Sequence, residues 1–214
     1  MRNRKHPIID IGSISFFADA TTEQLIEVGN PENKISVMEM LTLEDHHEFL
    51  FDKQSRNIKK GEWNDLEESE DLIYIWIRRI EALDPEGMRS HEATTRIEEA
   101  AKDLPVVDIS GTKFYWDRKD ASFLEVNNIW NKIYKNDLTI KDGVQGFYFD
   151  KRCNHVPFPH ELKEYQNGSL LPAHILFIST QDVLQQTENK NQLADASRKI
   201  SVKRTFGNKK SNRL

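Results

Sequence analysis

Apolar residues along this chain gather in short runs that are broken by turn residues, without a sustained helical periodicity. Short runs bounded by Gly, Pro, Asn and Asp predict strands and hairpins. In the first half, strands are expected near residues 7–11, 14–19, 24–28, 35–38, 47–52 and 72–78. In the second half they are expected near 105–109, 112–117, 122–126, 132–135, 146–150 and 174–179.

The two sets of strands correspond, because residues 7–58 moved forward by 98 positions fall on residues 105–156 without a gap. Fifteen positions are then identical, whereas average composition would give roughly three. They are Pro7/Pro105, Asp10/Asp108, Ile11/Ile109, Phe16/Phe114, Asp19/Asp117, Glu27/Glu125, Val28/Val126, Asn30/Asn128, Asn33/Asn131, Lys34/Lys132, Ile35/Ile133, Phe49/Phe147, Phe51/Phe149, Asp52/Asp150 and Lys53/Lys151. We therefore expect an internal duplication with the same antiparallel arrangement in both segments.

Turn residues separate the strands at matching places. Gly12-Ser13 and Ser110-Gly111 predict tight hairpins between the first two strands of each half. Asn30-Pro31-Glu32-Asn33 predicts a turn, with Asn33 as a left-handed residue, and residues 128–131 keep both asparagines of that turn.

A helix is expected between the halves. Residues 91–103 are rich in helix formers, and Ser90 is a candidate N-cap. Leu104-Pro105 then ends the helix and starts the second copy. From Gln181 onward a polar helix is expected, followed by a tail with too little apolar content to pack.

These patterns predict an α+β fold that is mainly β. Two duplicated small antiparallel β domains are joined by a short helix and followed by a flexible basic C-terminal tail. The first β-rich repeat is expected over residues 6–88, the connecting helix over 89–103, the second repeat over 104–180, and the polar helix with the basic tail over 181–214.

Composition fits two small cores with much solvated surface, since 37% of the 214 residues are hydrophobic and 30% are charged. No apolar run approaches the roughly 20 residues that span a membrane, and the start of the chain lacks the apolar stretch of a secretory signal. Cys153 has no second cysteine to pair with, in keeping with a reducing compartment. We therefore expect a cytoplasmic protein with no membrane partner.

The charge is distributed unevenly. Residues 196–214 carry seven Lys and Arg and no acid, so the net charge of −5 leaves −12 on the rest of the chain. The acidic centre, residues 39–100, holds 17 Asp and Glu against eight Lys and Arg. Any attraction to phosphate is expected in the tail, whose candidate contacts are Lys203, Arg204, Phe206, Lys209, Lys210 and Arg213. The alternative is a tail that only solubilises the chain.

Familiar catalytic motifs are missing: the sequence has no glycine-rich phosphate loop, GxSxG or HExxH motif, and no pair of CxxC motifs. The aspartates shared by the two halves are interpreted as caps of local backbone groups at turns. Cys153, His155 and His160, with His174, could hold zinc, although their spacing fits no standard module. His46 and His47 are expected on a loop surface.

Among the aromatic residues, most lie in strand-like runs and are expected in the core. Trp130 differs because it falls in a predicted turn. It either covers a sheet or anchors a partner interface, and it is the candidate partner-binding residue of the body.

The first copy contains the pattern P-x-[IV]-D-I, L-x-E-V-x-N-x-x-N-x-I and F-x-x-D, with Leu83-Asp84-Pro85-Glu86-Gly87 after its last strand. The second copy keeps these three motifs except that Phe123 stands at the position of Leu25. The pattern resembles that of a group of bacteroidete-type proteins. Those proteins carry tandem copies of a small β-rich domain and are often associated with mobile or conjugative elements. The resemblance covers about residues 6–180, carries over no catalytic residues and leaves the function open. No cofactor is expected. The second copy departs from it, with Ser179-Thr180-Gln181-Asp182 in place of the LDPxG element.

Three functions stay open at this point. The first is a non-enzymatic binding or adaptor protein that uses its duplicated domains to hold a protein partner. The second is a nucleic-acid accessory protein that binds through the basic tail. The third is a metalloprotein or enzyme that uses Cys153, His155 and His160.

Overall fold

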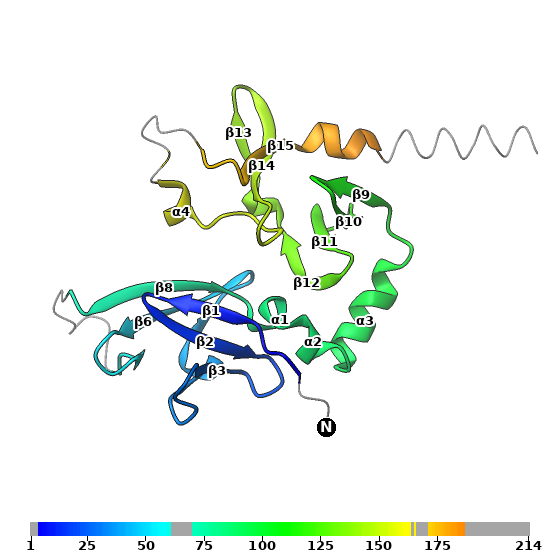
Figure 1. Ribbon diagram of the computed structural model, residues 1–214. Helices are drawn as coiled ribbons and strands as arrows, with labels where there is room; N and C mark the ends of the chain where they lie inside the picture. Colours follow the sequence, from blue (N-terminus) through cyan, green and yellow to red (C-terminus); the bar gives the residue numbers. More distant parts are fainter. Residues whose placement is uncertain (1–3, 61–69, 164, 166–170, 187–214) are drawn as a thin grey trace, which may run out of the picture. The chain divides into compact units, whose positions relative to one another are not determined.

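The structure is a computed structural model that describes residues 4–60, 70–163, 165 and 171–186 (Figure 1). The described chain is mainly β, as the sequence predicts, and its named strands pair antiparallel. Two compact units are present: unit 1 comprises Met1–Asp103 and Leu124–Tyr134, and unit 2 comprises Leu104–Phe123 and Lys135–Leu214. The basic tail and its candidate residues, Lys203, Arg204, Phe206, Lys209, Lys210 and Arg213, lie outside the described residues.

The first sheet of unit 1 has the strand order β1-β2-β3-β4. Its strands are β1 (Ile8–Ile11), β2 (Ile14–Asp19), β3 (Gln24–Glu27) and β4 (Lys34–Ser36). The tight hairpin between β1 and β2 is confirmed, because Ile11 pairs with Ile14 and Gly12 adopts φ +60°, which glycine tolerates without strain. The turn before β4 is also confirmed: the Asn33 N–H donates to the Asn30 carbonyl at 3.0 Å.

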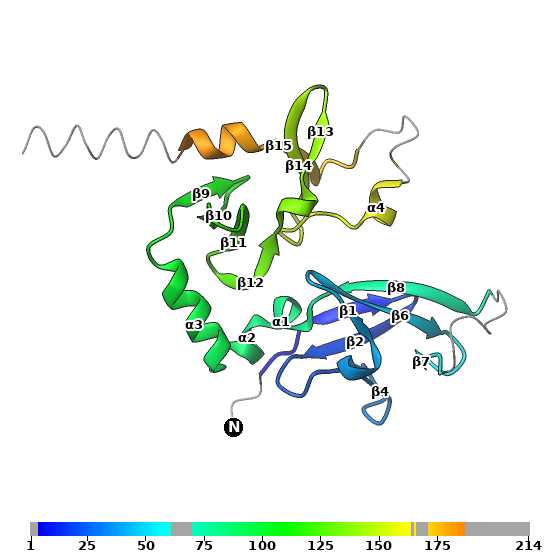
Figure 2. The same cartoon turned by 180° about the vertical axis from the view of Figure 1, so that it is seen from behind.

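The second sheet of unit 1 is built around β6. A short 3-10 helix, η1 (Val37–Glu39), leads into β5 (Leu41–Thr42), which is followed by β6 (His46–Asp52), β7 (Asn57–Ile58) and β8 (Leu72–Arg78). β5 and β7 pair with opposite ends of β6, and β8 pairs with β6 over its whole length. The view from behind in Figure 2 shows β6 and β8 running beside β1 and β2.

Both sheets contribute to one hydrophobic core. Phe16 of β2 and Phe51 of β6 are fully buried and meet edge to face, with ring centroids 6.0 Å apart. Leu25 and Ile35 add the inward face of β3 and β4. Burying one such side chain stabilises the fold by about 1.5–3 kcal/mol relative to leaving it exposed. Along β3 and β4, buried positions alternate with more exposed ones, which favours a single register for these strands.

Three short helices follow β8: α1 (Ile80–Leu83), α2 (Pro85–Met88) and α3 (Glu92–Ala101). The predicted connecting helix is confirmed by α3. Its predicted cap was wrong, because the residue at the N-cap is His91, whose ring nitrogen accepts from the Ala93 N–H at 3.2 Å. The capping position thus lies one residue later than Ser90.

In the second half of the chain the strand order of the first sheet recurs as β12-β11-β10-β9. The strands are β9 (Val106–Ile109), β10 (Thr112–Asp117), β11 (Ser122–Glu125) and β12 (Asn128–Ile133). A three-stranded sheet follows, with β13 (Thr139–Lys141), β14 (Val144–Asp150) and β15 (Ile175–Ser179), after the 3-10 helix η3 (Lys135–Asp137). The helix α4 (Pro159–Lys163) lies between β14 and β15, and residues 180–186 are helical.

The core of unit 2 is aromatic. Phe114 meets Phe149 with ring centroids 6.1 Å apart, and Phe123 meets Phe147 at 5.8 Å. All four side chains are at most 1% exposed. The strand-like aromatic runs therefore form core, as the sequence indicates.

The turn expected over residues 128–131 is wrong, because these residues begin β12. Ile129, Asn131 and Ile133 are buried and alternate with less buried neighbours, which is the period of a strand. The two asparagines suggested a turn by their type, but the burial of every second residue decided the conformation.

Among the described residues, no helix combines the length and the apolar character needed to cross a bilayer.

Candidate functional site

Five of the six aspartates shared by the two halves accept hydrogen bonds from the turns that follow them. Asp19, Asp52, Asp117 and Asp150 each accept from the backbone N–H two residues further on, at 2.8–3.0 Å. Asp108 accepts from the Gly111 N–H at 2.8 Å. The interpretation as turn caps is thus confirmed for these five, and their repetition needs no shared catalytic chemistry. Asp10 instead accepts from the hydroxyl of Ser15, its partner across the β1–β2 pair, at 2.6 Å.

A second pair, a glutamate and an asparagine six residues later, recurs at matching positions of the two halves. The Asn33 amide donates to Glu27 at 2.8 Å, and the Asn131 amide donates to Glu125 at 2.7 Å. Asn33 is absent from the residues with positive φ, so its predicted left-handed conformation was wrong. Both asparagines instead satisfy a buried carboxylate, which explains why the Glu and the Asn recur together.

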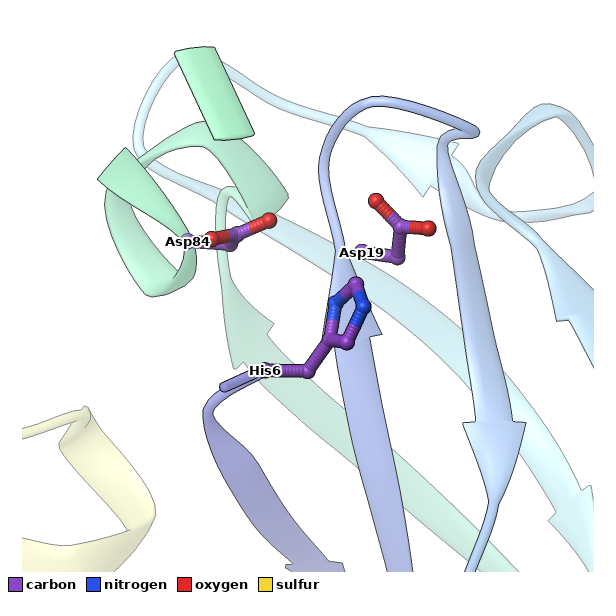
Figure 3. Close-up of side chains that lie close together, drawn as sticks. All are labelled: His6, Asp19 and Asp84. Atoms are coloured by element: carbon purple, nitrogen blue, oxygen red, sulfur yellow. The ribbon is translucent and has the colours of Figure 1, made fainter. Parts of the chain in front are cut away.

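One group of side chains in the described part of the chain has its ligand atoms close enough together for a metal ion: His6, Asp19 and Asp84, within 4.8 Å of one another. Figure 3 shows the three side chains converging from the segment before β1, the end of β2 and the turn between α1 and α2. Asp84 is 1% exposed. A buried carboxylate in such a position requires a cation or several hydrogen-bond donors.

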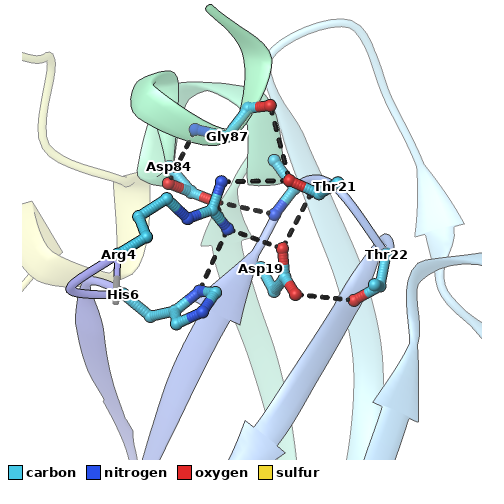
Figure 4. A network of polar contacts seen from close by, with 8 residues as sticks. Arg4, His6, Asp19, Thr21, Thr22, Asp84 and Gly87 are labelled. Carbon is cyan, nitrogen blue, oxygen red and sulfur yellow. Dashed lines mark hydrogen bonds and ion pairs between the residues drawn. The ribbon is translucent and has the colours of Figure 1, made fainter. Parts of the chain in front are cut away.

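The guanidinium of Arg4 supplies that cation (Figure 4). Its Nη2 atom lies 2.7 Å from Asp19 Oδ1, 2.8 Å from Asp84 Oδ2 and 3.1 Å from His6 Nδ1. A metal ion at this point would have to displace Arg4, which is always protonated. The cluster is therefore an ion-pair network that attaches the N-terminal segment to the body of unit 1.

The carboxylate oxygens of this cluster are all engaged. Asp84 accepts from the Ala20 N–H at 3.0 Å and from the Gly87 N–H at 3.1 Å. Burial alone would raise the pKa of Asp19, but hydrogen bonds from Thr22, the Thr21 amide and Arg4 outweigh it and lower that pKa below its ordinary value. The contacts of both aspartates are thus structural, and those of Asp19 favour its ionised form.

His46 and His47 are not on a loop surface, and that expectation was wrong. They begin β6 and are 7% and 1% exposed. The Nε2 atom of His47 accepts from the Ile80 N–H at 3.2 Å, and Nδ1 lies 3.0 Å from the Thr42 hydroxyl. This pattern requires a neutral ring that carries its proton on Nδ1. Burial above all, with Arg79, lowers the pKa of His47 from 6.5 to about 4.

His46 belongs to a chain of polar groups on the opposite face of β6. Its two ring nitrogens lie 2.6 Å from Asp45 Oδ1 and 2.7 Å from Glu48 Oε1, and its ring stacks on Trp76 at 4.7 Å. The Tyr74 hydroxyl donates to Glu48. Burial and the neighbouring Glu48 raise the pKa of Tyr74 to about 12, so this phenol stays protonated at neutral pH.

Cys153, His155 and His160 are not brought together as a metal-ligand group within the described residues. The Cys153 thiol faces the Asp150 carbonyl at 3.8 Å, and the His155 ring is bonded to the Val156 carbonyl at 2.8 Å. The His160 ring stacks on Phe158. Each of the three side chains thus has a local contact of its own, and the zinc hypothesis gains no support from their geometry.

Trp130 lies in β12 and packs against the core of unit 1. Its indole N–H donates to the Thr94 hydroxyl of α3 at 3.0 Å, and that hydroxyl donates to the Met88 carbonyl at 2.7 Å. The indole is therefore bonded at its polar end and packed along its apolar body. This placement favours the sheet-cover interpretation over an interface anchor.

Exposed apolar side chains gather on two corresponding hairpins. Five of the eight large hydrophobic residues exposed in the described chain lie there. Met38 (87% exposed), Leu41 (53%) and Leu43 (39%) form what we call the β5 patch, in unit 1. Ile140 (73%) and Val144 (43%) form the β13 patch, in unit 2. The sequence pattern missed both, because it predicted neither β5 nor β13.

A cavity of about 500 Å³ lies beside the β13 patch, wholly within unit 2. Its walls come from the start of β14 and from the helical residues 180–186. The side chains that line it are Val144, Gln145, Thr180, Gln181, Leu184 and Gln185. A volume of this size lies in the range of small-ligand and short-peptide sites.

No known family model, curated protein or solved structure matches this chain. The function is therefore argued from the residues of the chain itself.

Proposed function

We propose that this protein is a non-enzymatic binding or adaptor protein whose two β-rich modules hold a protein partner. The observation that carries the proposal is the pair of exposed apolar patches on corresponding hairpins, the β5 patch and the β13 patch. Isolated exposed apolar residues are ordinary, but a local concentration of them favours protein contact.

The proposal includes an internal duplication of the module. In its support, β9 begins 98 residues after β1, and β10, β11, β13 and β14 follow β2, β3, β5 and β6 by the same interval. The bridge between Asp150 and His155 occupies the place of the pairing between Asp52 and Asn57. Two copies of one binding surface give avidity without new chemistry. Kinship with the tandem-domain proteins of mobile elements forms part of the same proposal.

The polar clusters of the described chain favour binding over catalysis. Five of the six shared aspartates cap turns, Arg4 holds Asp19 and Asp84, and the phenol of Tyr74 stays protonated. These groups are engaged in contacts that stabilise the fold. The exposed apolar side chains, in contrast, gain nothing from the fold and lose contact with water only when a partner covers them.

The experiment is affinity capture, with the full-length protein as bait and a lysate of the cells that express it as the source of partners. The captured material is analysed by mass spectrometry and for nucleic acid. Leu41→Glu and Ile140→Glu place a charge in each patch, and Thr139→Glu places the same charge at an exposed polar position of β13. We expect the double variant to lose a protein that the wild type and Thr139→Glu retain. Retention of the same proteins by all three would refute the proposal.

A second candidate is nucleic-acid binding through the basic tail, favoured by the seven cationic residues and absent acids of residues 196–214. The acidic body should repel phosphate. Mobility-shift titrations of the full chain and of a fragment ending at Ala196, each at low and high salt, test it. Equal affinity of both proteins for DNA or RNA would exclude the tail as the binding element.

A further inference from the structure

The cavity in unit 2 lies where the sheet comes to an end. The ladder between β14 and β15 ends at the pair Gly146 and Ser179. The next residue, Thr180, is already helical, whereas β14 continues for two residues through Gln145 and Val144, which pair only with β13. The edge of β14 on the β15 side is thus open at the cavity, and a strand in line with β15 would continue the sheet there.

The lining of the cavity is neutral. Its described side chains are three carboxamides, one hydroxyl and two aliphatic groups, with no charged group among them, in a chain in which 30% of residues are charged. Phosphate or carboxylate ligands would find no cation here, and the basic tail would find no acid. The lining suits an uncharged ligand that carries both hydrogen-bond donors and acceptors, because each carboxamide of the lining can also donate and accept.

One polar group of the lining is buried without a partner among the described residues. The carboxamides of Gln145, Gln181 and Gln185 belong to exposed residues and are open to a ligand. The Thr180 hydroxyl, in contrast, is buried on a residue that is 8% exposed, and it lacks a partner within the described part of the chain. Buried polar groups are nearly always paired in folded proteins, so this hydroxyl is an exception that a bound ligand would remove.

We propose that this cavity binds a short extended peptide segment of neutral sequence, with carboxamide and small aliphatic side chains. The peptide backbone lies against the open edge of β14, and its amides pair with the glutamines, each of which both donates and accepts. Val144 and Leu184 receive an aliphatic side chain. This inference rests on the proposed protein-binding function and assigns the chemistry of one bound segment.

The test uses the full-length protein, labelled with ¹⁵N, and three probes. The first is the blocked peptide acetyl-Gly-Gln-Val-Gln-Gly-amide, the second its isosteric anionic analogue with Glu in place of Gln, and the third is maltose. Short peptides in such a cavity are expected to bind with a Kd of about 1 mM, which NMR titration detects. We expect the neutral peptide to shift the side-chain signals of Gln145, Gln181 and Gln185, and its glutamate analogue to bind about tenfold more weakly.

Variants separate binding from folding. Gln181→Ala and Thr180→Val should each weaken the peptide about tenfold. Thr180→Val removes an unpaired hydroxyl and should leave the melting temperature unchanged or raise it, an outcome that a purely structural Thr180 would not give. Gln54→Ala, outside the cavity, is the matched control and should bind as the wild type does.

Absence of shifts at the three glutamines, equal binding of the glutamate analogue, or stronger binding of maltose would each overturn the inference. The outcome is separable from that of the patch variants. Loss of a captured partner in Leu41→Glu/Ile140→Glu without peptide binding would leave the proposed function standing and refute the cavity site. If the peptide binds but no captured partner depends on the patches, the cavity site stands and the proposed function is refuted.

Discussion

The neutral state of His47 makes the stability of this protein depend on pH in a defined window. The ring is 1% exposed, accepts from the Ile80 N–H and has a pKa of about 4 in the folded chain. In the unfolded chain the value returns to about 6.5. Between these values the unfolded state binds a proton that the folded state does not, so stability is complete above pH 6.5 and is lost as pH falls to 4.

The size of the effect follows from the two pKa values. The difference between 6.5 and about 4 corresponds to about 3 kcal/mol of unfolding free energy. The local reason is visible in the contacts: a proton on Nε2 would break the bond from Ile80 and leave a charge at a buried site beside Arg79.

The assay is urea unfolding of the wild type and of His47→Gln at several pH values from 7 to 4. Glutamine does not titrate, and its carbonyl oxygen can still accept from the Ile80 N–H. We expect the free energy of unfolding of the wild type to fall by about 3 kcal/mol more than that of the variant across this range. Subtracting the two curves removes the contribution of the other histidines. Parallel curves, or an NMR titration of His47 with a midpoint near 6.5, would refute the reasoning.

Three further changes have defined outcomes. Arg4→Gln removes the cation from the buried carboxylate of Asp84 and should lower the free energy of unfolding, measured in urea, by about 3 kcal/mol. Arg4→Lys keeps a cation and should lower it less. Equal unfolding midpoints of Arg4→Gln and the wild type would contradict the network. Gly146→Ala places a methyl group against the backbone carbonyl oxygen of Ile178 in β15, and thermal melting should show a loss of about 1–3 kcal/mol. An unchanged melting temperature would mean that this close approach is relieved at no cost. Trp130→Phe keeps an aromatic ring but removes the hydrogen bond to Thr94, and should lower the free energy of unfolding by about 1 kcal/mol. Trp130→Ala should lower it by about 3–5 kcal/mol. An alanine variant with the melting temperature of the wild type would favour the role of interface anchor for Trp130.

Strands and tight turns could be predicted from the sequence, because their signals are local. Alternating apolar runs and Gly12-Ser13 determine the β1–β2 hairpin within a dozen residues. The turn-capping role of five of the six shared aspartates is equally local, since each of the five bonds to an amide two or three residues away. Short elements such as β5 and β7 could not be predicted, because two residues carry no periodicity.

The candidate clusters could not be predicted, since they depend on distant parts of the chain. His47 is buried because β8, more than 20 residues later, pairs along β6 and leads into Ile80. Arg4 finds Asp84 only once the turn between α1 and α2 is placed beside β2. In Asn128-Ile129-Trp130-Asn131 the residue types indicated a turn, but the burial of Ile129 and Asn131 in the sheet prevailed.

The assignment of β12 to unit 1 has a consequence for how the chain can be divided. Unit 1 is assembled from two separate stretches of sequence, with Leu104–Phe123 of unit 2 inserted between them. A fragment that stops at Asp103 therefore lacks Trp130 and the strand that packs on α1, α2 and α3. A cut after Asp103 thus divides unit 1 itself, and the fragment that ends there is expected to be less stable than unit 1 in the full chain.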